Sequence, residues 1–403
     1  MKFTINAKEL YKMVDSVKGV APKKSCLKML QQVFIRMNKE LKTVDVFATD
    51  FEQWAWAYTH DVDFLDDIYG VVGINPDAIN IFKAFTGDVT VDVERCYDNL
   101  ELGIIHVYDT TIKLSIPCVI YDYENENLKI PENISKCVNF TCFENWLKET
   151  ISNLAKFTAK SSSNKMCQVI NFNTMEYRVE ACDGYRIGTR TMFSKDVNIY
   201  SKDNVKLNAK YVPAIKKLLN NSNDDEVCID QGDKYIFITS IRTQGFNFVY
   251  ICKTEEGMYF NVSQTINCNY SNNFYPDAEK LLTVAKAAAK VVGKNIIPMM
   301  IYNKYKLHND CTDLQTYTKV NGVENVNNFY IKAAHMPEDF YIGIKPIYLV
   351  DALSICDADK VEIRLNGSNS PIIIEDNEYI FLCLPIRPAT GIVDSMLKLF
   401  REK

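Results

Sequence analysis

An internal repeat is the sequence feature that most limits how this chain can fold. A helical pattern with its apolar residues on one face follows a short β-rich segment at three places, and the leading leucines of these patterns are Leu10, Leu147 and Leu281. Successive leucines lie about 135 residues apart, a period too long for one unit of a solenoid. Each repeat is therefore expected to bury a hydrophobic core of its own.

Two further markers keep this period. In each repeat a short alternating segment runs into a second predicted helix, with Pro76 and Pro346 in the first turn of two of them, where a missing N–H costs nothing. After the second helix comes a turn and an alternating strand that contains Val89, Val227 or Val361. The strand-to-helix segments are 72–76, 205–209 and 342–346. We expect three tandem domains of the same topology, each with two helices and a majority of strands, which is the α+β class.

Polar stretches mark the expected linkers. Tyr123–Lys136 and Val262–Asn273 are both short of apolar residues, as domain linkers usually are. The expected domains are 1–136, 137–266 and 267–403, the last with a C-terminal extension over 388–403.

Composition limits the class and the compartment. With 403 residues, 47% of them hydrophobic and 24% charged, the chain resembles an ordinary soluble globular protein. No apolar run approaches the ~18 residues of a transmembrane helix, and the N-terminus lacks the apolar core of a secretory signal. The 13 cysteines are scattered without a C-x-x-C pair, which favours reduced thiols and a cytoplasmic protein.

No motif of an enzyme is present. The sequence lacks G-x-x-x-x-G-K-[ST], G-x-G-x-x-G and G-x-S-x-G. The histidines stand alone and offer no H-x-x-x-H metal face; they are His60, His106, His308 and His335. Asp50 and Asp183 occupy equivalent turns of two repeats, which argues against an acid pair. These features favour a binding scaffold without metal or cofactor, and an enzyme with a site spread across the repeats stays open as the alternative.

The predicted helices are basic although the chain has a net charge of −5. Lysines recur at i,i+4 spacing on the first helix of every repeat. Two of the second helices also carry lysines, without this spacing. They are Lys8, Lys12, Lys156, Lys160, Lys286, Lys290 and Lys294 on first helices, and Lys83, Lys210, Lys216 and Lys217 on second helices. A solvated face explains any one pair, but the recurrence indicates a polyanion contacted through its backbone. The second helix of the third repeat departs from this trend, because it carries Asp351.

The pattern resembles the bacterial DNA polymerase sliding clamp, the β subunit of the replicative polymerase. The resemblance covers the chain up to Pro388 and is most specific in the segments 1–4, 48–52, 181–187 and 384–387. It implies a DNA-clamp fold in which each of three like domains packs two helices on antiparallel sheets, and the subunit forms half of a ring. Two subunits close head to tail around double-stranded DNA and tether the DNA polymerase and other proteins with a clamp-binding motif. The family hydrolyses nothing, and a separate clamp-loader ATPase loads the ring. A clamp-like scaffold or decoy that binds replication partners without encircling DNA stays open.

The resemblance also implies site residues. The pocket for partner peptides that end in an apolar-aromatic pair is similar here to Cys182, Gly184, Tyr185, Arg186, Ile187, Leu382, Leu384, Pro385, Ile386 and Arg387. The expected DNA contacts are Lys24, Lys160 and Lys165, together with the helix lysines Lys12, Lys83, Lys156, Lys216, Lys286 and Lys290. The seam between subunits is implied where Ile112 faces Val291 and Val292. Cys182 stands where the family usually has Thr and Tyr185 where it often has His, and an aromatic-Pro-Asp-Tyr wall of the family's pocket has no clear match around Gly257–Phe260.

The last predicted strand, which begins near Ile380, runs into Pro385 and an arginine, and a proline fits a sheet only at an edge or a strand end. The chain then continues beyond the point where the family normally stops. This tail contains Leu399-Phe400, which resembles the end of a partner peptide. Two alternatives stay open: an amphipathic helix docked on the nearest apolar surface, or a built-in ligand that competes for the pocket.

Overall fold

The computed structural model describes residues 1–38, 40–66, 68, 70–122, 129–131, 138–307, 311–334 and 340–401. Several features named in the sequence analysis fall wholly or largely outside these residues. They are the predicted linker 123–136, the boundary between 136 and 137, His308 and His335, and the last two residues of the tail. By its internal contacts the chain forms two compact units, one of Met1–Ser152 with Ser194–Glu256 and one of Asn153–Phe193 with Gly257–Lys403.

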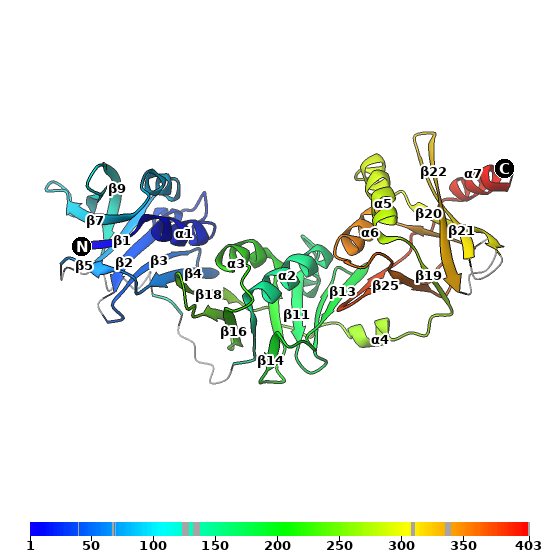
Figure 1. Cartoon of the computed structure of the whole chain (residues 1–403), viewed down its shortest axis with the longest axis horizontal. Coiled ribbons are helices and arrows are strands. Elements are labelled where there is room, and N and C mark those ends of the chain that lie inside the picture. Colours follow the sequence, from blue (N-terminus) through cyan, green and yellow to red (C-terminus); the bar gives the residue numbers. More distant parts are fainter. Residues whose placement is uncertain are drawn as a thin grey trace. The chain divides into compact units, whose positions relative to one another are not determined.

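The first unit contains one continuous antiparallel sheet and the helices that cover it (Figure 1). Its elements are β1 (Lys2–Asn6), α1 (Ala7–Val17), η1 (Lys28–Gln31), β2 (Val33–Asn38), β3 (Thr43–Thr49), β4 (Gln53–Thr59), β5 (Asp63–Phe64), β6 (Gly70–Ile74), η2 (Pro76–Ala84), β7 (Asp88–Arg95), β8 (Leu102–Tyr108), β9 (Lys113–Tyr121), β10 (Phe140–Phe143), α2 (Glu144–Leu154), β14 (Val197–Ile199), β15 (Val205–Asn208), η6 (Ala209–Tyr211), α3 (Val212–Leu218), β16 (Glu226–Gln231), β17 (Tyr235–Ser240) and β18 (Asn247–Lys253). The strand order is β14-β10-β16-β17-β18-β4-β3-β2-β6-β9-β8-β7-β1-β5.

The second unit has a sheet of the same kind. Its elements are η4 (Ala155–Phe157), η5 (Lys165–Gln168), β11 (Val169–Asn173), β12 (Arg178–Cys182), β13 (Arg186–Thr191), α4 (Val262–Ile266), β19 (Asn272–Tyr275), α5 (Ala278–Val292), β20 (Met299–Leu307), β21 (Cys311–Val320), β22 (Val323–Ala334), β23 (Phe340–Ile344), α6 (Pro346–Leu353), β24 (Glu362–Leu365), β25 (Ile372–Asp376), β26 (Tyr379–Cys383) and α7 (Thr390–Arg401). Its strands follow the order β11-β12-β13-β26-β25-β24-β19-β22-β21-β20-β23, all antiparallel.

The order of elements along the chain confirms the predicted repeat and the α+β class. A strand, a first helix, three strands, a further strand, a second helix and three closing strands follow one another from β1, from β10 and from β19, and the first two repeats carry one additional short strand, β5 or β14, before the second helix. The first helices bury the apolar face that the periodicity predicted, since Leu10, Leu147 and Leu281 are at most 1% exposed. The second helix of the first repeat differs in kind: it is a 3-10 helix that starts at Pro76 after the cap residue Asn75, which accepts a hydrogen bond from the N–H of Asp77.

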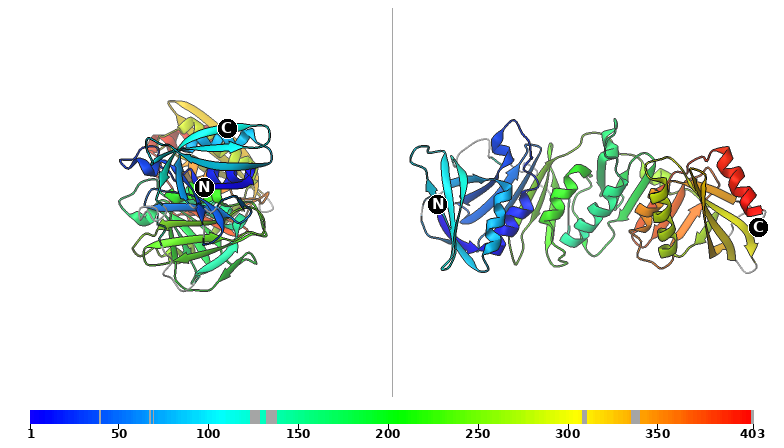
Figure 2. Two further views of the ribbon diagram at one scale, coloured as in Figure 1. Left: turned by 90° about the vertical axis from the view of Figure 1, so that its left-hand side faces the viewer. Right: turned by 90° about the horizontal axis from the view of Figure 1, so that it is seen from above.

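The tail forms α7, which packs on the third repeat (red in Figure 2). Met396 and Phe400 are buried in one cluster with Met300, Tyr302 and Tyr317. The cluster contains no residue of the predicted peptide pocket. The structure therefore agrees with the docked amphipathic helix and not with a tail seated in the pocket.

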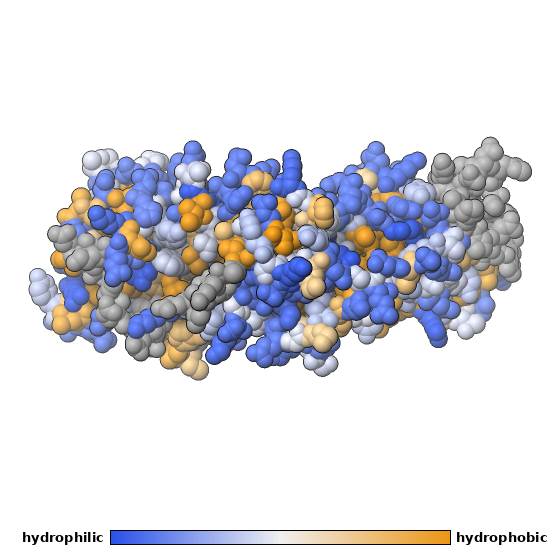
Figure 3. Space-filling view, turned by 90° about the horizontal axis from the view of Figure 1, so that it is seen from below, coloured by the Kyte–Doolittle hydropathy of each residue, from blue (hydrophilic) through white to orange (hydrophobic). Residues whose placement is uncertain are grey.

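On the face drawn in Figure 3, hydrophilic residues predominate and apolar ones lie in separate patches. Among the residues that the structure describes, no helix is long and apolar enough to cross a membrane.

Candidate functional site

Two strand junctions repeat the same geometry, one within each unit. In the first unit β18, the last strand of the second repeat, pairs antiparallel with β4, so that Ile251 lies opposite Trp54. In the second unit β26, the last strand of the third repeat, pairs antiparallel with β13, so that Leu382 lies opposite Ile187. Because β4 and β13 hold the same place in their repeats, each junction joins the same two kinds of strand.

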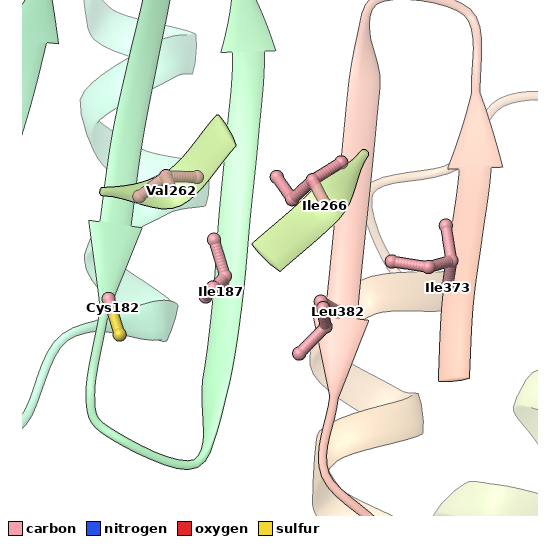
Figure 4. Close-up of a cluster of buried hydrophobic side chains, with 6 residues drawn as sticks. All are labelled: Cys182, Ile187, Val262, Ile266, Ile373 and Leu382. Carbon is pink, nitrogen blue, oxygen red and sulfur yellow. The ribbon is translucent and has the colours of Figure 1, made fainter. Parts of the chain in front are cut away.

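The junction between β13 and β26 holds the apolar part of the predicted peptide pocket. Cys182, Ile187 and Leu382 lie on one face of the sheet together with Ile373, and all four side chains are at most 7% exposed. The short helix α4 lies across this face and adds two further apolar side chains (Figure 4). We call this set the groove cluster; its members are Cys182, Ile187, Val262, Ile266, Ile373 and Leu382.

The wall that had no clear match in the sequence is made by the segment around α4. Tyr259 and Phe260 pack against the groove cluster, and their rings meet at a centroid distance of 5.1 Å. Asn261 caps α4 by accepting a hydrogen bond from the N–H of Gln264. The structure thus supplies aromatic residues at this place without the family's proline and aspartate.

Cys182 contributes to the groove as an apolar group. Burial raises the pKa of its thiol to about 11, so the sulfur is uncharged at neutral pH. The turn that follows is fixed by Asp183, whose Oδ1 accepts the N–H groups of Tyr185 and Arg186, both at 2.9 Å. Gly184 occupies the left-handed region with φ of +91°, a conformation that glycine adopts without steric cost.

The predicted pocket residues that follow β12 and β26 are more exposed than the groove cluster. Tyr185 is 64% exposed and Leu384 37% exposed, and the N–H of Leu384 donates to the carbonyl of Tyr185 at 2.9 Å. Pro385 and Ile386 are half-buried beyond the end of β26, and Arg387 is exposed. These residues surround the groove cluster with groups that a ligand could reach without unfolding the sheet.

Arg186 lies on the other face of the sheet from the groove cluster. Its guanidinium stacks over the rings of Phe157 and Tyr348, donates to the carbonyl of Lys156 at 2.6 Å, and bonds Asp183 at 2.8 Å and also Asp351. Burial disfavours its charge, but the hydrogen bonds that it donates to the two carboxylates outweigh this cost and raise the pKa of Arg186. Arg186 thus lies apart from Cys182, Ile187 and Leu382 and links β13 to α6 through Asp351.

In the first unit the predicted DNA-contacting lysines come from adjacent helices. Lys12 on α1, Lys83 on η2 and Lys216 on α3 are exposed, and both η2 and α3 pack against α1. The ammonium group of Lys83 lies 4.9 Å from the ring centre of Tyr11, a cation–π contact that keeps it on this surface. Lys24 is exposed in the loop after α1.

A further cation in this unit escaped the sequence reasoning. Lys148 on α2 donates to the carbonyl of Leu219 at 2.9 Å and to Oδ1 of Asn221 at 2.8 Å. Burial lowers its pKa, and the positive charge of Lys216 lowers it further. Lys148 and Lys216 thus lie close enough to raise the local positive potential.

In the second unit the remaining predicted lysines lie on two segments. Lys286 and Lys290 are exposed on α5. Lys160 and Lys165 are exposed in and after the loop that follows η4, while Lys156 is half-buried and donates to Oγ of Ser354 at 3.1 Å. Asp351, which broke the basic trend, is held by Arg186.

The predicted seam residues differ in their exposure to solvent. Ile112 is half-buried in the turn before β9, where its N–H donates to Oδ1 of Asp109 at 2.7 Å. Val291 is 46% exposed at the end of α5. Val292 is 2% exposed and packs in the core of its own unit, so the structure leaves only its neighbour available to a second subunit.

Together these elements define a class of protein. The fold is the DNA-clamp fold: solved structures of bacterial clamps match nearly the whole chain. They include a putative DNA polymerase III β subunit from Eubacterium rectale (TM-score 0.80, 19% identity, covering 96% of this chain and 100% of that one). The clamp from Pseudomonas aeruginosa bound to griselimycin (TM-score 0.79, 18% identity, 96% and 99%) and that from Bacillus subtilis (TM-score 0.79, 15% identity, 96% and 100%) match equally well.

Sequence comparison points to the same family. The model of the DNA polymerase III beta subunit, C-terminal domain, matches residues 312–381. The beta sliding clamps of two strains of Staphylococcus epidermidis are 24% identical over 219 residues, which are 51% of this chain and 52% of theirs, so the match spans about half the length of these relatives. The resemblance to the bacterial DNA polymerase III β subunit is thereby confirmed.

No site for catalysis by a metal is found in the described residues. In this part of the chain, no group of three or more His, Cys, Asp and Glu side chains could hold a metal ion.

Proposed function

We propose that this protein is a cytoplasmic, non-catalytic sliding clamp. Two copies form a ring around double-stranded DNA, and the ring tethers the replicative polymerase and other partners with a clamp-binding motif for processive synthesis. A separate loader ATPase places the ring on DNA. One observation carries the proposal: the junctions β4–β18 and β13–β26 use the same two kinds of strand, and one strand of each kind is left over.

The two remaining strands are complementary edges. β9 is the last strand of the first repeat; it pairs with β8 along its length, but the pairing with β6 is limited to residues 119–121, so in the described structure residues 113–118 carry an open edge. β22 holds the place of β4 and β13; it pairs with β21 along residues 323–332 and with β19 only through residues 332–334. If β9 of one copy pairs with β22 of another, the contact is head to tail, and two such contacts close a dimer.

The lysines suit a duplex held without sequence readout. Lys12, Lys83, Lys216, Lys286 and Lys290 are exposed cations on helices, and lysine contacts phosphate as a flexible point charge. Each phosphate contact adds about 0.9 to the slope of log affinity against log salt concentration. Replacing Lys12 and Lys216 by Ala should lower that slope by up to about 1.8, whereas Lys202→Ala, an exposed lysine outside these helices, should leave it unchanged.

The groove cluster suits a short peptide with an apolar-aromatic end. Its floor is aliphatic side chains and one neutral thiol, and its rim carries Tyr185 and Leu384. Leu384→Ala should weaken the binding of such a peptide by roughly tenfold, as for an interface residue whose truncation costs more than about 1 kcal/mol. Phe193→Ala is the matched control, because Phe193 is 79% exposed and belongs to the same unit but to no part of the groove.

Topological retention tests the function directly. The ring is loaded with its loader ATPase on nicked circular DNA, and the DNA is then cut once. We expect the protein to stay on the circle through gel filtration and to leave after linearisation. Retention on the cut DNA would contradict encirclement. A strictly monomeric native mass at micromolar concentration would favour the clamp-like scaffold or decoy instead.

A further inference from the structure

The last strands of the three repeats can be compared position by position. The pairing register of the closing strands sets the alignment, since Val107, Ile238 and Ile374 hold the same place in their repeats. They lie opposite Leu114 in β9, Tyr250 in β18 and Phe381 in β26. Three residues further on stand Pro117, Lys253 and Leu384. Only β9 therefore has a residue without a backbone N–H at this place.

In the two junctions within the chain, this position directs its N–H at the neighbouring repeat. In β18 the N–H of Lys253 donates to the carbonyl of Glu52, the residue just before β4, at 3.0 Å. Directly after β26 the N–H of Leu384 donates to the carbonyl of Tyr185, the residue just before β13, at 2.9 Å.

In β9 the same position faces the open edge. The N–H of Ile120 donates to the carbonyl of Glu101 at 2.8 Å, on the side of β8. The register with β8 is regular from residue 113 to 119, with Pro117 opposite Ile104. Alternation then directs residues 113, 115 and 117 to the edge that no strand covers over this length, and at 117 the proline ring replaces a hydrogen-bond donor.

We propose that Pro117 makes the seam between subunits weaker than the junctions within a subunit, so that the ring opens at the seam. This inference rests on the proposed ring. A seam built like the internal junctions loses one backbone hydrogen bond at each of its two copies. The proline also protects the edge in the free subunit, because an edge strand that lacks a donor is a poor template for unrelated strands.

The replacement Pro117→Val restores the donor. One backbone hydrogen bond is equivalent to about a fivefold change in an association constant, so with two seams the dissociation constant of the dimer should fall about 25-fold. Analytical ultracentrifugation measures this constant, and mixing of two fluorescently labelled subunit pools measures the rate of exchange, which should slow. Valine fits the strand, and residue 117 makes no N–H bond to β8, so the fold of the subunit should be unaffected.

A second pair of variants separates the effect of a backbone N–H donor at the edge from the effect of the side chain. Ser115 faces the same edge, and its Oγ bonds Nδ1 of His106 at 2.7 Å. Ser115→Pro removes both this side-chain bond and a second edge donor, whereas Ser115→Ala removes only the side-chain bond. We expect a higher dissociation constant for Ser115→Pro than for Ser115→Ala.

The outcomes distinguish the inference from the proposed function. If the wild-type protein is dimeric and retained on circular DNA, but Pro117→Val changes neither the dissociation constant nor the exchange rate, the inference is wrong and the clamp stands. If the wild-type protein is monomeric, the ring fails; the inference then stands only if Pro117→Val dimerises and falls if it does not.

Discussion

The docking of α7 can be tested by shortening one side chain. Phe400 is 2% exposed, its ring stacks on Tyr302 at 5.1 Å, and it meets Tyr317 edge-on at 6.1 Å. Burying the side chains of Met396 and Phe400 yields roughly 3–6 kcal/mol, and truncating a buried Phe to Ala costs about 3–5 kcal/mol. Phe400→Ala therefore removes at least half of the energy that these two buried side chains contribute to holding the helix.

We expect α7 of this variant to separate from the third repeat. Amide hydrogen exchange across residues 390–401 should accelerate by about 100-fold, the equivalent of roughly 3 kcal/mol. Lys398→Ala is the control, because Lys398 is exposed on the same helix and its loss should leave exchange within about twofold of wild type.

The same helix tests whether the tail competes for the groove. Deleting residues 389–403 should leave the affinity of a partner peptide unchanged within about twofold, because Phe400 packs with Tyr302 and Tyr317 and with no groove residue. Fluorescence anisotropy with a labelled peptide gives this affinity. An increase of fivefold or more on deletion would refute the docking described above and restore the tail as a competing ligand.

Two further changes test the second unit. A Cβ at Gly188 would lie 2.7 Å from the ring of Phe157, so Gly188→Ala should cost about 1–3 kcal/mol in chemical unfolding, while Gly87→Ala, where nothing lies within 4 Å, should not. Burial raises the pKa of Glu180 above the ordinary glutamate value of 4.5, so the folded state holds this proton more tightly than the unfolded state. The stability from protonated Glu180 is present below pH 4.5 and lost as the pH rises through the folded pKa; Glu180→Gln should abolish that decrease in urea unfolding compared across this range.

Local patterns predicted the parts of this fold that depend on local physics. The periodicity of α1 and the start of the second helix at Pro76 are both encoded within a few residues. The strand that ends before Pro385 is encoded in the same way, and β26 ends at Cys383. Because the same local patterns recur in each repeat, they predict the order of helices and strands along the whole chain.

The features that could not be predicted from the sequence depend on contacts between residues that are distant along the chain. Arg186 and Ile187 are neighbours in one motif, yet strand alternation puts them on opposite faces, and only the second belongs to the groove. Similarly, Arg242 and Glu144 form a buried ion pair at 2.7 Å although 98 residues separate them. No composition or spacing signal reports such a pair, because its energy depends on a tertiary arrangement that excludes water.

The two internal junctions differ in the side chains that fill them, and this difference supports the proposed peptide pocket at only one of them. At the β4–β18 junction the position of Ile187 is taken by Trp54, whose indole meets the ring of Tyr235 at 5.5 Å and packs with Phe237 and Ile251. Large planar rings fill this space rigidly. At the β13–β26 junction the same place holds smaller aliphatic groups under α4, a helix of only five residues. Short helices are marginal on their own, so we expect α4 to be the element that shifts when the proposed peptide binds. The repeat therefore supplies one geometry twice, and under the proposed function the residue opposite the last strand distinguishes the structural junction from the one that binds a partner.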